Sequence, residues 1–581
     1  MNQRVLFAWL GLACTLPPLL AYNLTPSATL FNQLLALGLW GLVMANSNGQ
    51  LQTRSQWDLH AAPWLLMLAA AGASVLINGL PLSLALAGFA LVGGALFVLQ
   101  WARALDGSIR QQTFTALCWG LVAAGALSTL VSIVQVFEPT WPDGVWIAHS
   151  GIPGRAIGNM RQPNHLASLL LWACIAAVWL SESRLDRANT GAARRLPPGL
   201  ALSLFAFVFA VVLSASRTGM FLGVTLLALW GVLDRSLSRG ARLALMLTPL
   251  MALMSAGLMV WWAHANDAAF GAESRLAEGA GSPSRIAILR NTWALLQQNP
   301  WTGVGWGEFN LAWTMTPFPD RPVAFFDHCH NLVMQLLVEL GWPLGLLVLG
   351  LLAASIWRAC QAARMAQGAN APMLRCAFML VLMIGLHSML EYPLWYAYFL
   401  LPTACALGLL LGAADDAALS ESGALRWPSL PAAVVRIVGG LMAAASIYAV
   451  WDYAHIVAIY DPGPNAGSLE SRVARGQRSV FFSTLADYAA ATTFSPGAQA
   501  LVATRQTAHN LIDARLMKDW AESLNALGDV DRARYVAARL REFHNAAVAD
   551  WFAECDQSEA RDALPFQCTA PQREYGFREM R

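Results

Sequence analysis

The stretch TFTALCWGLVAAGALSTLVSIVQVF occupies residues 113–137 and contains no charged side chain. A run of this length can cross about 30 Å of hydrocarbon as a single helix. Further apolar runs of this kind bring the predicted number of membrane spans to about thirteen. They lie near residues 4–22, 26–46, 63–78, 81–102, 164–181, 198–214, 218–234, 243–263, 331–356, 375–391, 395–413 and 434–453.

The composition of the 581-residue chain supports a membrane protein. Hydrophobic residues make up 57% of the sequence and charged residues 12%, which is about half the charged fraction of a soluble domain. So few charges cannot solvate a globular surface, and we expect an all-α, polytopic membrane protein. The first run is interrupted by Pro17 and Pro18 and no small-residue cleavage site follows it, so we interpret it as a span rather than a signal peptide.

The distribution of arginine predicts the orientation. If the N-terminus is cytoplasmic, three arginines fall in short outer loops: Arg155, Arg161 and Arg217. Sixteen fall on the inner side, where membrane proteins concentrate basic residues: Arg4, Arg54, Arg103, Arg110, Arg184, Arg187, Arg194, Arg195, Arg235, Arg239, Arg242, Arg358, Arg364, Arg375, Arg426 and Arg436. An odd number of spans then places the C-terminal tail outside.

Two segments outside the membrane are long enough to fold, the loop at about 264–330 and the tail at 454–581. We therefore expect a transmembrane domain over 1–453 and a helical domain over 454–581. In the tail, Gly528 can end one helix and Asp529 can cap the next, which predicts a helical hairpin of weakly tetratricopeptide-like character. Cys555 and Cys568 both lie there, and an oxidising compartment favours a disulfide between them.

Polar residues gather at the outer ends of several predicted spans. The first group is GRAIGNMRQPNHLA at 154–167, with Arg155, Arg161, Gln162 and Asn164. Proline and asparagine are common at helix N-termini. A helix start alone does not explain Gln162 together with two arginines on a face where arginine is otherwise rare.

Two further groups each present one arginine. The turn SASRTG at 214–219 contains Arg217, which taken alone could be a snorkelling side chain. The sequence SPSR at 282–285 contains Arg285 and is followed by NPWTGVGWG at 299–307. An arginine in a loop is ordinarily just solvated, so Arg285 by itself carries little information.

The fourth group is DHCHNLVMQLLVELGWP at 327–343. His330 stands at the outer start of a predicted span, and Glu339 lies nine residues further on, about 13 Å deeper in a regular helix. The two side chains therefore cannot touch directly. A histidine can serve as a general base near neutral pH, although one at a helix start is more often structural. The turn HSMLEYPLWY at 387–396 adds Glu391 and Tyr392 on the same side.

The predicted topology brings Gln162, Arg217, Arg285, His330 and Tyr392 to one side of the membrane. This coincidence indicates a site. Guanidinium groups bind phosphate oxygens through bidentate, charge-assisted bonds, so two arginines suit a pyrophosphate. A nearby histidine suits removal of a proton from an attacking hydroxyl.

Several of these motifs resemble those of the O-antigen ligase and polymerase superfamily of membrane glycosyltransferases, of the GT-C class. The matching pieces are SRTG at 216–219, SR at 284–285, NPWTGVG from 299, and HN at 330–331 followed by ELG at 339–341. The stretch 158–167, the turn LEYP at 390–393 and the helical tail are similar to the protein O-oligosaccharyltransferases of the pilin-glycosylating type.

The resemblance implies en bloc transfer of an oligosaccharide from undecaprenyl diphosphate to a hydroxyl group, in the periplasm at the bacterial inner membrane. It implies inversion, no cofactor, no metal and no nucleic-acid partner. The acceptor would be serine or threonine of a pilin-like or periplasmic protein. Arg217 and Arg285 would bind the donor diphosphate, and His330 would activate the acceptor, with His328 as the alternative base. The supporting residues would be Gln162, Asn164, Arg155, Arg161, Tyr392, Glu391 and Glu339.

Other functions remain open from the sequence. An O-antigen ligase uses the same donor but transfers the glycan to the lipid A core, and its typical members lack a long periplasmic tail. An O-antigen polymerase is a more distant alternative. A lipid-glycan transporter should show ionisable residues near the membrane midplane and repeated halves, and we see neither. A purely assembling scaffold is the most distant alternative.

The arginine count generates a topological prediction. Reporter fusions after residues 190 and 365 should report the cytoplasm, and fusions after residues 280 and 500 should report the periplasm. A cytoplasmic signal at residue 500 would contradict the odd number of spans. A cytoplasmic signal at residue 280 would separate Arg285 and His330 from the other site residues.

Overall fold

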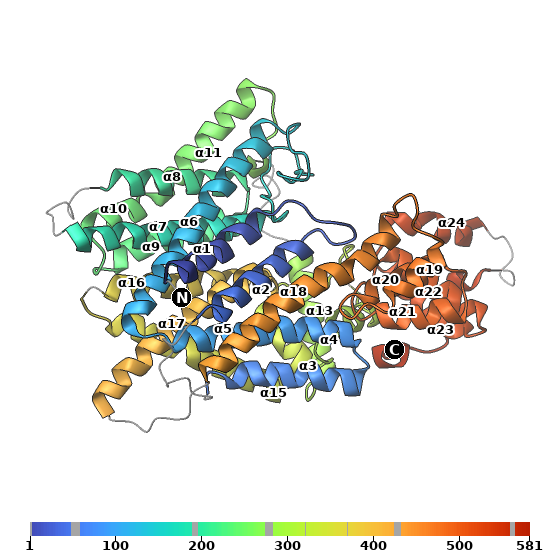
Figure 1. The fold of residues 1–581 in the computed structure, drawn as a ribbon. Coiled ribbons are helices and arrows are strands. Elements are labelled where there is room, and N and C mark those ends of the chain that lie inside the picture. The colour runs from blue at the N-terminus through green and yellow to red at the C-terminus, as the bar shows by residue number, and fades with distance from the viewer. Residues whose placement is uncertain are drawn as a thin grey trace. The chain divides into compact units, whose positions relative to one another are not determined.

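The computed structural model describes residues 3–47, 59–188, 196–273, 283–319, 321–368, 370–422, 431–557 and 564–581. Arg54, Arg194, Arg195 and Arg426 of the arginine count, and Ser282 of the SPSR motif, lie outside these ranges. Within the described ranges the regular elements are helices and no strand occurs, so the predicted all-α class is confirmed (Figure 1).

The apolar runs form helices. Among the described residues, eight helices are long and apolar enough to cross a membrane, and five further apolar helices are shorter, with 10–17 residues. Together they coincide with the predicted runs, whereas the number of thirteen spans stays a prediction. The helices are α1 (Gln3–Leu19), α2 (Leu30–Ala45), α3 (Ala62–Asn78), α4 (Leu82–Gly88), η1 (Phe89–Gly93), α5 (Gly94–Arg103), α6 (Gly107–Phe137), α7 (Pro163–Ala188), α8 (Pro198–Leu213), η3 (Thr218–Gly223), α9 (Val224–Leu233), α10 (Arg239–Met246), α11 (Thr248–Ala265), α15 (Leu332–Met365), α16 (Asn370–His387), α17 (Ala397–Ser422) and α18 (Ala432–Tyr460).

The chain forms two compact units, and the first comprises Met1–Ala61, Gly93–Gly281 and Leu352–Tyr448. Its central helix is α7, which packs on α6, α8 and α16. In the most apolar stretch of 18 residues of this helix, 94% of the residues are buried. Small residues allow the helices to approach closely, as is common where apolar helices pack in membranes. On α17, a Cβ atom at Gly408 would lie 2.3 Å from the carbonyl oxygen of Leu99 on α5.

Ion pairs join the helix ends of this unit that the sequence predicts to be cytoplasmic. Asp415 accepts from Arg103 at 2.6 Å and from Arg358 at 2.8 Å, and Arg110 lies 3.0 Å from Asp416. The Arg103 side chain is only 1% exposed, so it needs this partner. The basic residues at these helix ends thus lie together, as the predicted alternation of the spans requires. Which side of the membrane they face stays a prediction.

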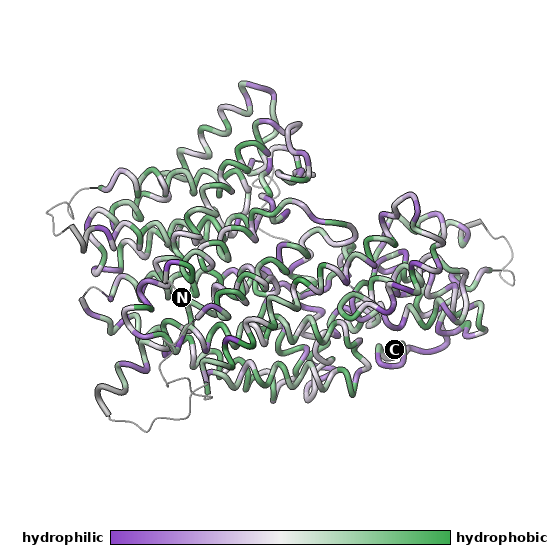
Figure 2. Tube along the Cα trace, in the orientation of Figure 1, coloured by the Kyte–Doolittle hydropathy of each residue, from purple (hydrophilic) through white to green (hydrophobic). Residues whose placement is uncertain are grey.

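The second unit comprises Ala62–Val92, Ser282–Leu351 and Ala449–Arg581, so the tail forms one body with the loop that carries Arg285 and His330. The loop contributes α13 (Pro283–Gln298) and α14 (Phe309–Met315). The tail helices are α19 (Leu469–Gly476), α20 (Ser483–Thr493), α21 (Ala498–Thr507), α22 (Ala514–Ala526), α23 (Val530–Arg541) and α24 (Ala549–Gln557). Figure 2 shows hydrophilic residues far more often in these tail helices than in the membrane helices.

The predicted helical hairpin of the tail is α22 followed by α23. Gly528 adopts a φ of 82°, which a residue with a Cβ atom rarely adopts, and ends the first helix. The carboxylate of Asp529 then accepts a hydrogen bond from the backbone N–H of Arg532 and caps the second helix. The stop and the cap that the sequence predicts are therefore both present.

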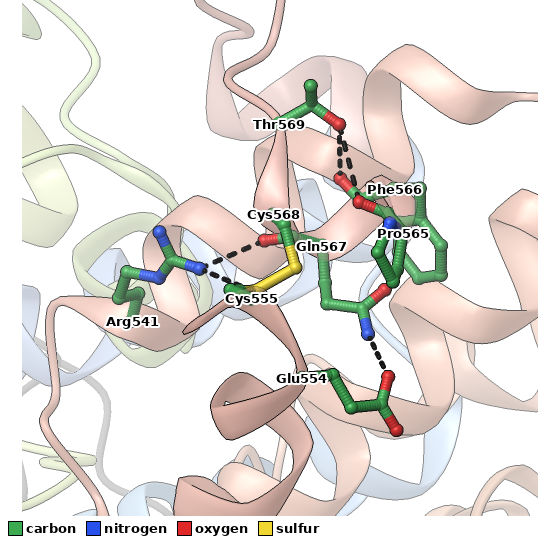
Figure 3. Close-up of a disulfide and its surroundings, with 8 residues drawn as sticks. All are labelled: Arg541, Glu554, Cys555, Pro565, Phe566, Gln567, Cys568 and Thr569. Atoms are coloured by element: carbon green, nitrogen blue, oxygen red, sulfur yellow. Dashed lines mark hydrogen bonds between the residues drawn. A yellow bond between two sulfur atoms is a disulfide. The ribbon is translucent and has the colours of Figure 1, made fainter. Parts of the chain in front are cut away.

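A disulfide links Cys555 on α24 to Cys568, as the sequence favours (Figure 3). The guanidinium of Arg541, at the end of α23, donates to the Cys555 sulfur at 3.2 Å and to the Gln567 carbonyl oxygen at 3.3 Å. The disulfide therefore joins α24 to the turn at Cys568, and Arg541 joins both to the end of the hairpin.

We expect the double change Cys555→Ser/Cys568→Ser to lower the free energy of unfolding of the tail by about 2–4 kcal/mol, because it releases a short closed loop. Thermal unfolding of the purified protein, with and without a reducing agent, measures this effect. The reducing agent should lower the melting temperature of the unaltered protein and leave that of the variant unchanged. Equal melting temperatures of the two proteins without reductant would contradict a stabilising disulfide.

Candidate functional site

In the first unit, three of the predicted motifs meet at Asn164. Its amide nitrogen donates to the Glu391 carboxylate at 2.9 Å, and its amide oxygen accepts from the Ser216 hydroxyl at 2.7 Å. Glu391 is only 4% exposed. The start of α7, the turn at 214–219 and the turn at 387–396 are thereby fastened together, although they are separated by up to 227 residues in the sequence.

The residues just before Asn164 hold the start of α7. The side-chain oxygen of Gln162 accepts the backbone N–H groups of Asn164 and His165 and so caps the helix. Arg161 has a φ of 55°, and its guanidinium donates to the carbonyl oxygen of Ala28 at 3.1 Å. Burial lowers the pKa of Arg161, but an arginine remains charged in a protein. A positive charge therefore stays beside this helix start.

Arg155 and Ser216 order the turn that presents Arg217. Arg155 is buried, and its Nε donates to the carbonyl oxygen of Ser214 at 2.9 Å. Ser216 also accepts the backbone N–H of Gly219 at 3.2 Å. Arg217 itself is half-buried and immediately precedes η3. Arg155 thus holds the backbone of the turn through Ser214. The side chain of Arg217 remains partly accessible.

Aromatic rings and hydroxyl groups cluster on α7 and the turn at 387–396, next to the hydrogen bonds of Asn164. Tyr392 is half-buried and its ring stacks on Tyr396, whose ring centre is 4.5 Å from that of His165. The Ser168 hydroxyl is 2.6 Å from Nδ1 of His387. The sequence interpretation missed Ser168 and His165. Ser168 lies four residues after Asn164, and this helical spacing was the signal that could have placed it on the same face.

In the second unit, His330 has an unusual backbone conformation. Its φ is 58°, in the left-handed region that residues other than glycine rarely adopt. Its half-buried imidazole meets the ring of Phe326 edge-on, with 5.4 Å between ring centres. The next residue, Asn331, caps α15 by accepting the N–H of Met334 at 3.0 Å. The cap of α15 therefore directly follows a histidine whose backbone is held in a strained conformation by its surroundings.

Strained backbone coincides with the predicted motifs. Among the described residues, five that are not glycine have a positive φ, and Arg161, Ala215 and His330 are three of them. Such conformations persist only where surrounding contacts stabilise them, and they cluster at functional positions. Two of the three residues lie in the first unit and one in the second, so both units contain motifs with this feature.

Glu339 reaches the neighbourhood of His330 through Gln335. The Gln335 amide donates to the Glu339 carboxylate at 2.9 Å, and its oxygen accepts the backbone N–H of Cys329 at 2.8 Å. The predicted separation of His330 and Glu339 is thus bridged by a residue that the sequence interpretation did not select. Gln335 lies four residues before Glu339, the spacing at which helical side chains meet.

Two glycines explain why the NPWTGVG and ELG motifs occur together. A Cβ atom on Gly303 would lie 2.5 Å from the Glu339 carbonyl oxygen, and one on Gly341 would lie 2.5 Å from that of Trp301. Both glycines also have a positive φ. The backbone N–H of Val304 donates to Val338, so the two motifs pack backbone against backbone beside Glu339.

The remaining predicted residues of this unit are Arg285 and the candidate base His328. Arg285 is half-buried in the first turn of α13. His328 lies 3.0 Å from the Asp327 carboxylate. Burial raises the pKa of Asp327, but the charge and hydrogen bond of His328, a backbone hydrogen bond and the charge of His330 together lower it below its usual value. His328 therefore has a carboxylate beside it, and the imidazole of His330 packs edge-on against Phe326.

Cys329, between the two histidines, is not a reactive thiol. Burial raises its pKa to about 12, so the thiol stays protonated, and it donates to the Asn331 carbonyl oxygen at 3.2 Å.

No group of three or more histidine, cysteine, aspartate or glutamate residues in the described part of the chain could hold a metal ion.

Comparison with known families matches the segments that carry these motifs. Residues 156–180 match the protein glycosylation ligase family, residues 202–349 match the O-antigen ligase family, and residues 376–557 match the C-terminal part of the virulence factor membrane-bound polymerase family. The first match contains Gln162 and Asn164, and the second contains Arg217, Arg285 and His330. The resemblance that the motifs indicate is confirmed.

Two relatives come from Acinetobacter baylyi. The chain is 25% identical over 356 residues to a general O-oligosaccharyltransferase, covering 58% of this chain and 57% of the relative. It is 23% identical over 297 residues to a ComP-specific O-oligosaccharyltransferase, covering 51% of this chain and 50% of the relative. The matched part therefore spans about half the length of either relative.

Proposed function

We propose that this chain, similar in its motifs to the O-antigen ligases and the protein O-oligosaccharyltransferases, is a glycosyltransferase of the bacterial inner membrane. It transfers an oligosaccharide en bloc from undecaprenyl diphosphate to serine or threonine hydroxyls of a pilin-like or periplasmic protein. The observation that carries the proposal is His330, half-buried and left-handed at the start of α15, inside the segment that matches the O-antigen ligases.

The chemistry needs one base and a stabilised leaving group. His330 takes the proton of the acceptor hydroxyl while its oxygen attacks the anomeric carbon of the donor sugar. The bond from that carbon to the diphosphate oxygen breaks, and undecaprenyl diphosphate leaves with the electron pair. Arg217 and Arg285 neutralise the charge on the diphosphate. A single displacement of this kind inverts the anomeric configuration and requires no cofactor or metal.

The other predicted residues support this chemistry. Asn164 and Arg155 hold the turn that presents Arg217, and Gln162 and Glu391 in turn hold Asn164, through the hydrogen bonds described above. Glu339 acts through Gln335 on the backbone directly before His330. In this proposal Arg161 provides a further positive charge near the bound donor, and Tyr392 provides a phenol hydroxyl.

A protein acceptor is favoured by the match to the protein glycosylation ligases at 156–180 and by the names of both relatives, which are O-oligosaccharyltransferases. The second candidate is ligation to the lipid A core, which the O-antigen ligase match favours. Deleting the gene and comparing periplasmic glycoproteins with lipopolysaccharide ladders separates the two. Loss of protein glycans with intact lipopolysaccharide supports our proposal, and the reverse result supports the ligase.

Arg217→Ala and Arg285→Ala should each lower the transfer rate about a hundredfold or more, because each removes a contact to the diphosphate in a shielded site. Lysine at either position should restore only part of the rate, since an ammonium lacks the bidentate fork. The measurement is transfer of glycan from purified lipid-linked donor to acceptor protein. Arg290→Ala is the matched control, because Arg290 is exposed on the same helix as Arg285. A normal rate in either alanine variant removes that arginine from the mechanism.

His330→Ala should abolish glycan transfer while the protein remains folded and still binds the lipid-linked donor, because the arginines are untouched. His328→Ala is the internal control and should retain transfer. The unaltered enzyme should lose activity as the medium is acidified, because a protonated base cannot accept the hydroxyl proton. If His328→Ala is inactive and His330→Ala active, the base is His328. If both are active, histidine is not the base.

A further inference from the structure

One buried cation connects the tail to the loop before His330. The Arg321 side chain is 1% exposed, and its Nε donates to the Glu542 carboxylate of the tail at 2.8 Å. Its Nη1 donates to the carbonyl oxygen of Trp313 at 2.8 Å, and its Nη2 donates to that of Thr316. A planar guanidinium with partners on three nitrogens permits little rotation. Glu542 and the loop residues are therefore held in one relative arrangement.

Aromatic rings surround this ion pair. The Arg321 guanidinium lies 4.8 Å from the ring centre of Trp313 and 4.7 Å from that of Phe543, the tail residue after Glu542. Phe543 is fully buried and stacks on Phe325, with 4.0 Å between ring centres and 12° between ring planes. Stacked rings and cation–π contacts are directional, so they restrict orientation as well as position.

The ring contacts continue from the tail to His330. Phe543 meets Trp313 edge-on at 5.7 Å, Trp313 meets Phe326 edge-on at 5.7 Å, and Phe326 meets His330 at 5.4 Å. Phe326 also directly follows Phe325, on which Phe543 stacks. A continuous series of packed rings thus leads from the tail to the imidazole.

Further tail contacts hold both ends of α14, the helix that contains Trp313. At its end, the Tyr535 hydroxyl donates to the carbonyl oxygen of Met315 at 2.6 Å. At its start, the fully buried Glu308 lies 2.7 Å from Nδ1 of His509. A helix of seven residues has little stability of its own, so these contacts with the tail hold it in place.

We propose that the tail positions the catalytic histidine: Phe543, together with the Arg321–Glu542 ion pair, holds Phe325 and Phe326 so that the His330 imidazole keeps the orientation needed for proton removal. The inference rests on the role of His330 proposed above. The left-handed backbone of His330 requires stabilising contacts from its surroundings, and the ring of Phe326 is one of them. Phe543, Glu542 and Arg321 are positioning residues, because they act through other side chains.

The test is the steady-state kinetics of the purified full chain with undecaprenyl-diphosphate-linked oligosaccharide and a serine-containing pilin acceptor. Phe543→Ala should lower kcat at least tenfold, because small displacements of a catalytic group cost that much or more. KM for both substrates should stay within about twofold, because the variant leaves the substrate-binding arginines in place. Phe543→Leu, which keeps much of the apolar volume, should retain more activity than Phe543→Ala.

Trp551→Ala is the matched control. Trp551 is also a tail aromatic residue, but its ring contacts are with Phe552 and Phe566 beside the disulfide. Its kcat should stay near that of the unaltered protein. An equal loss in Trp551→Ala and Phe543→Ala would mean that activity follows the general stability of the tail, and would overturn the inference. If Phe543→Ala does not fold, Glu542→Gln is used in its place, with the same expected loss in kcat.

The two single variants, taken together, separate this inference from the proposed function. If His330→Ala is inactive and Phe543→Ala has a normal kcat, the positioning role is wrong and the base assignment stands. If His330→Ala is fully active, the base assignment itself is wrong.

Discussion

A polar side chain buried among apolar helices must find its partners within the protein, because hydrocarbon offers none. The two hydrogen bonds of Asn164 meet this requirement at the start of α7. They satisfy the buried Glu391 on one side and the Ser216 hydroxyl on the other. The same requirement pairs Arg103 with Asp415 at the opposite helix ends. The arrangement of the membrane helices in the first unit depends on such pairs as much as on apolar packing.

The second unit depends on close backbone contact rather than on a single polar residue. Gly303 and Gly341 allow the NPWTGVG segment to lie against the ELG segment, and no other residue type fits either position. This contact places Glu339 and Gln335 beside the backbone that precedes His330. Rigid support of this kind is what a catalytic group needs, because the orientation of a base matters as much as its identity.

The proposed chemistry makes different demands on the two kinds of residue. Arg217 and Arg285 must present guanidinium groups that the diphosphate can reach, and both side chains are half-buried. His330 must also point correctly, and it has the strained backbone, the capped helix start and the ring contact with Phe326. The tail contributes to this support through Glu542, which pairs with Arg321 of the loop, and through Phe543, which stacks on Phe325.

The sequence by itself determined the all-helical membrane class, because the length and apolar character of the runs follow from composition alone. It also determined the hairpin stop at Gly528 and the cap at Asp529, since both are local effects of single residues. Only the tertiary structure decided that Asn164 joins Ser216 and Glu391, that Gln335 connects Glu339 to Cys329, and that Arg321 pairs with Glu542. Most of these partners lie far apart in the chain. A buried polar group can pair with any suitable partner that folding brings within about 3 Å, and no local pattern specifies which one.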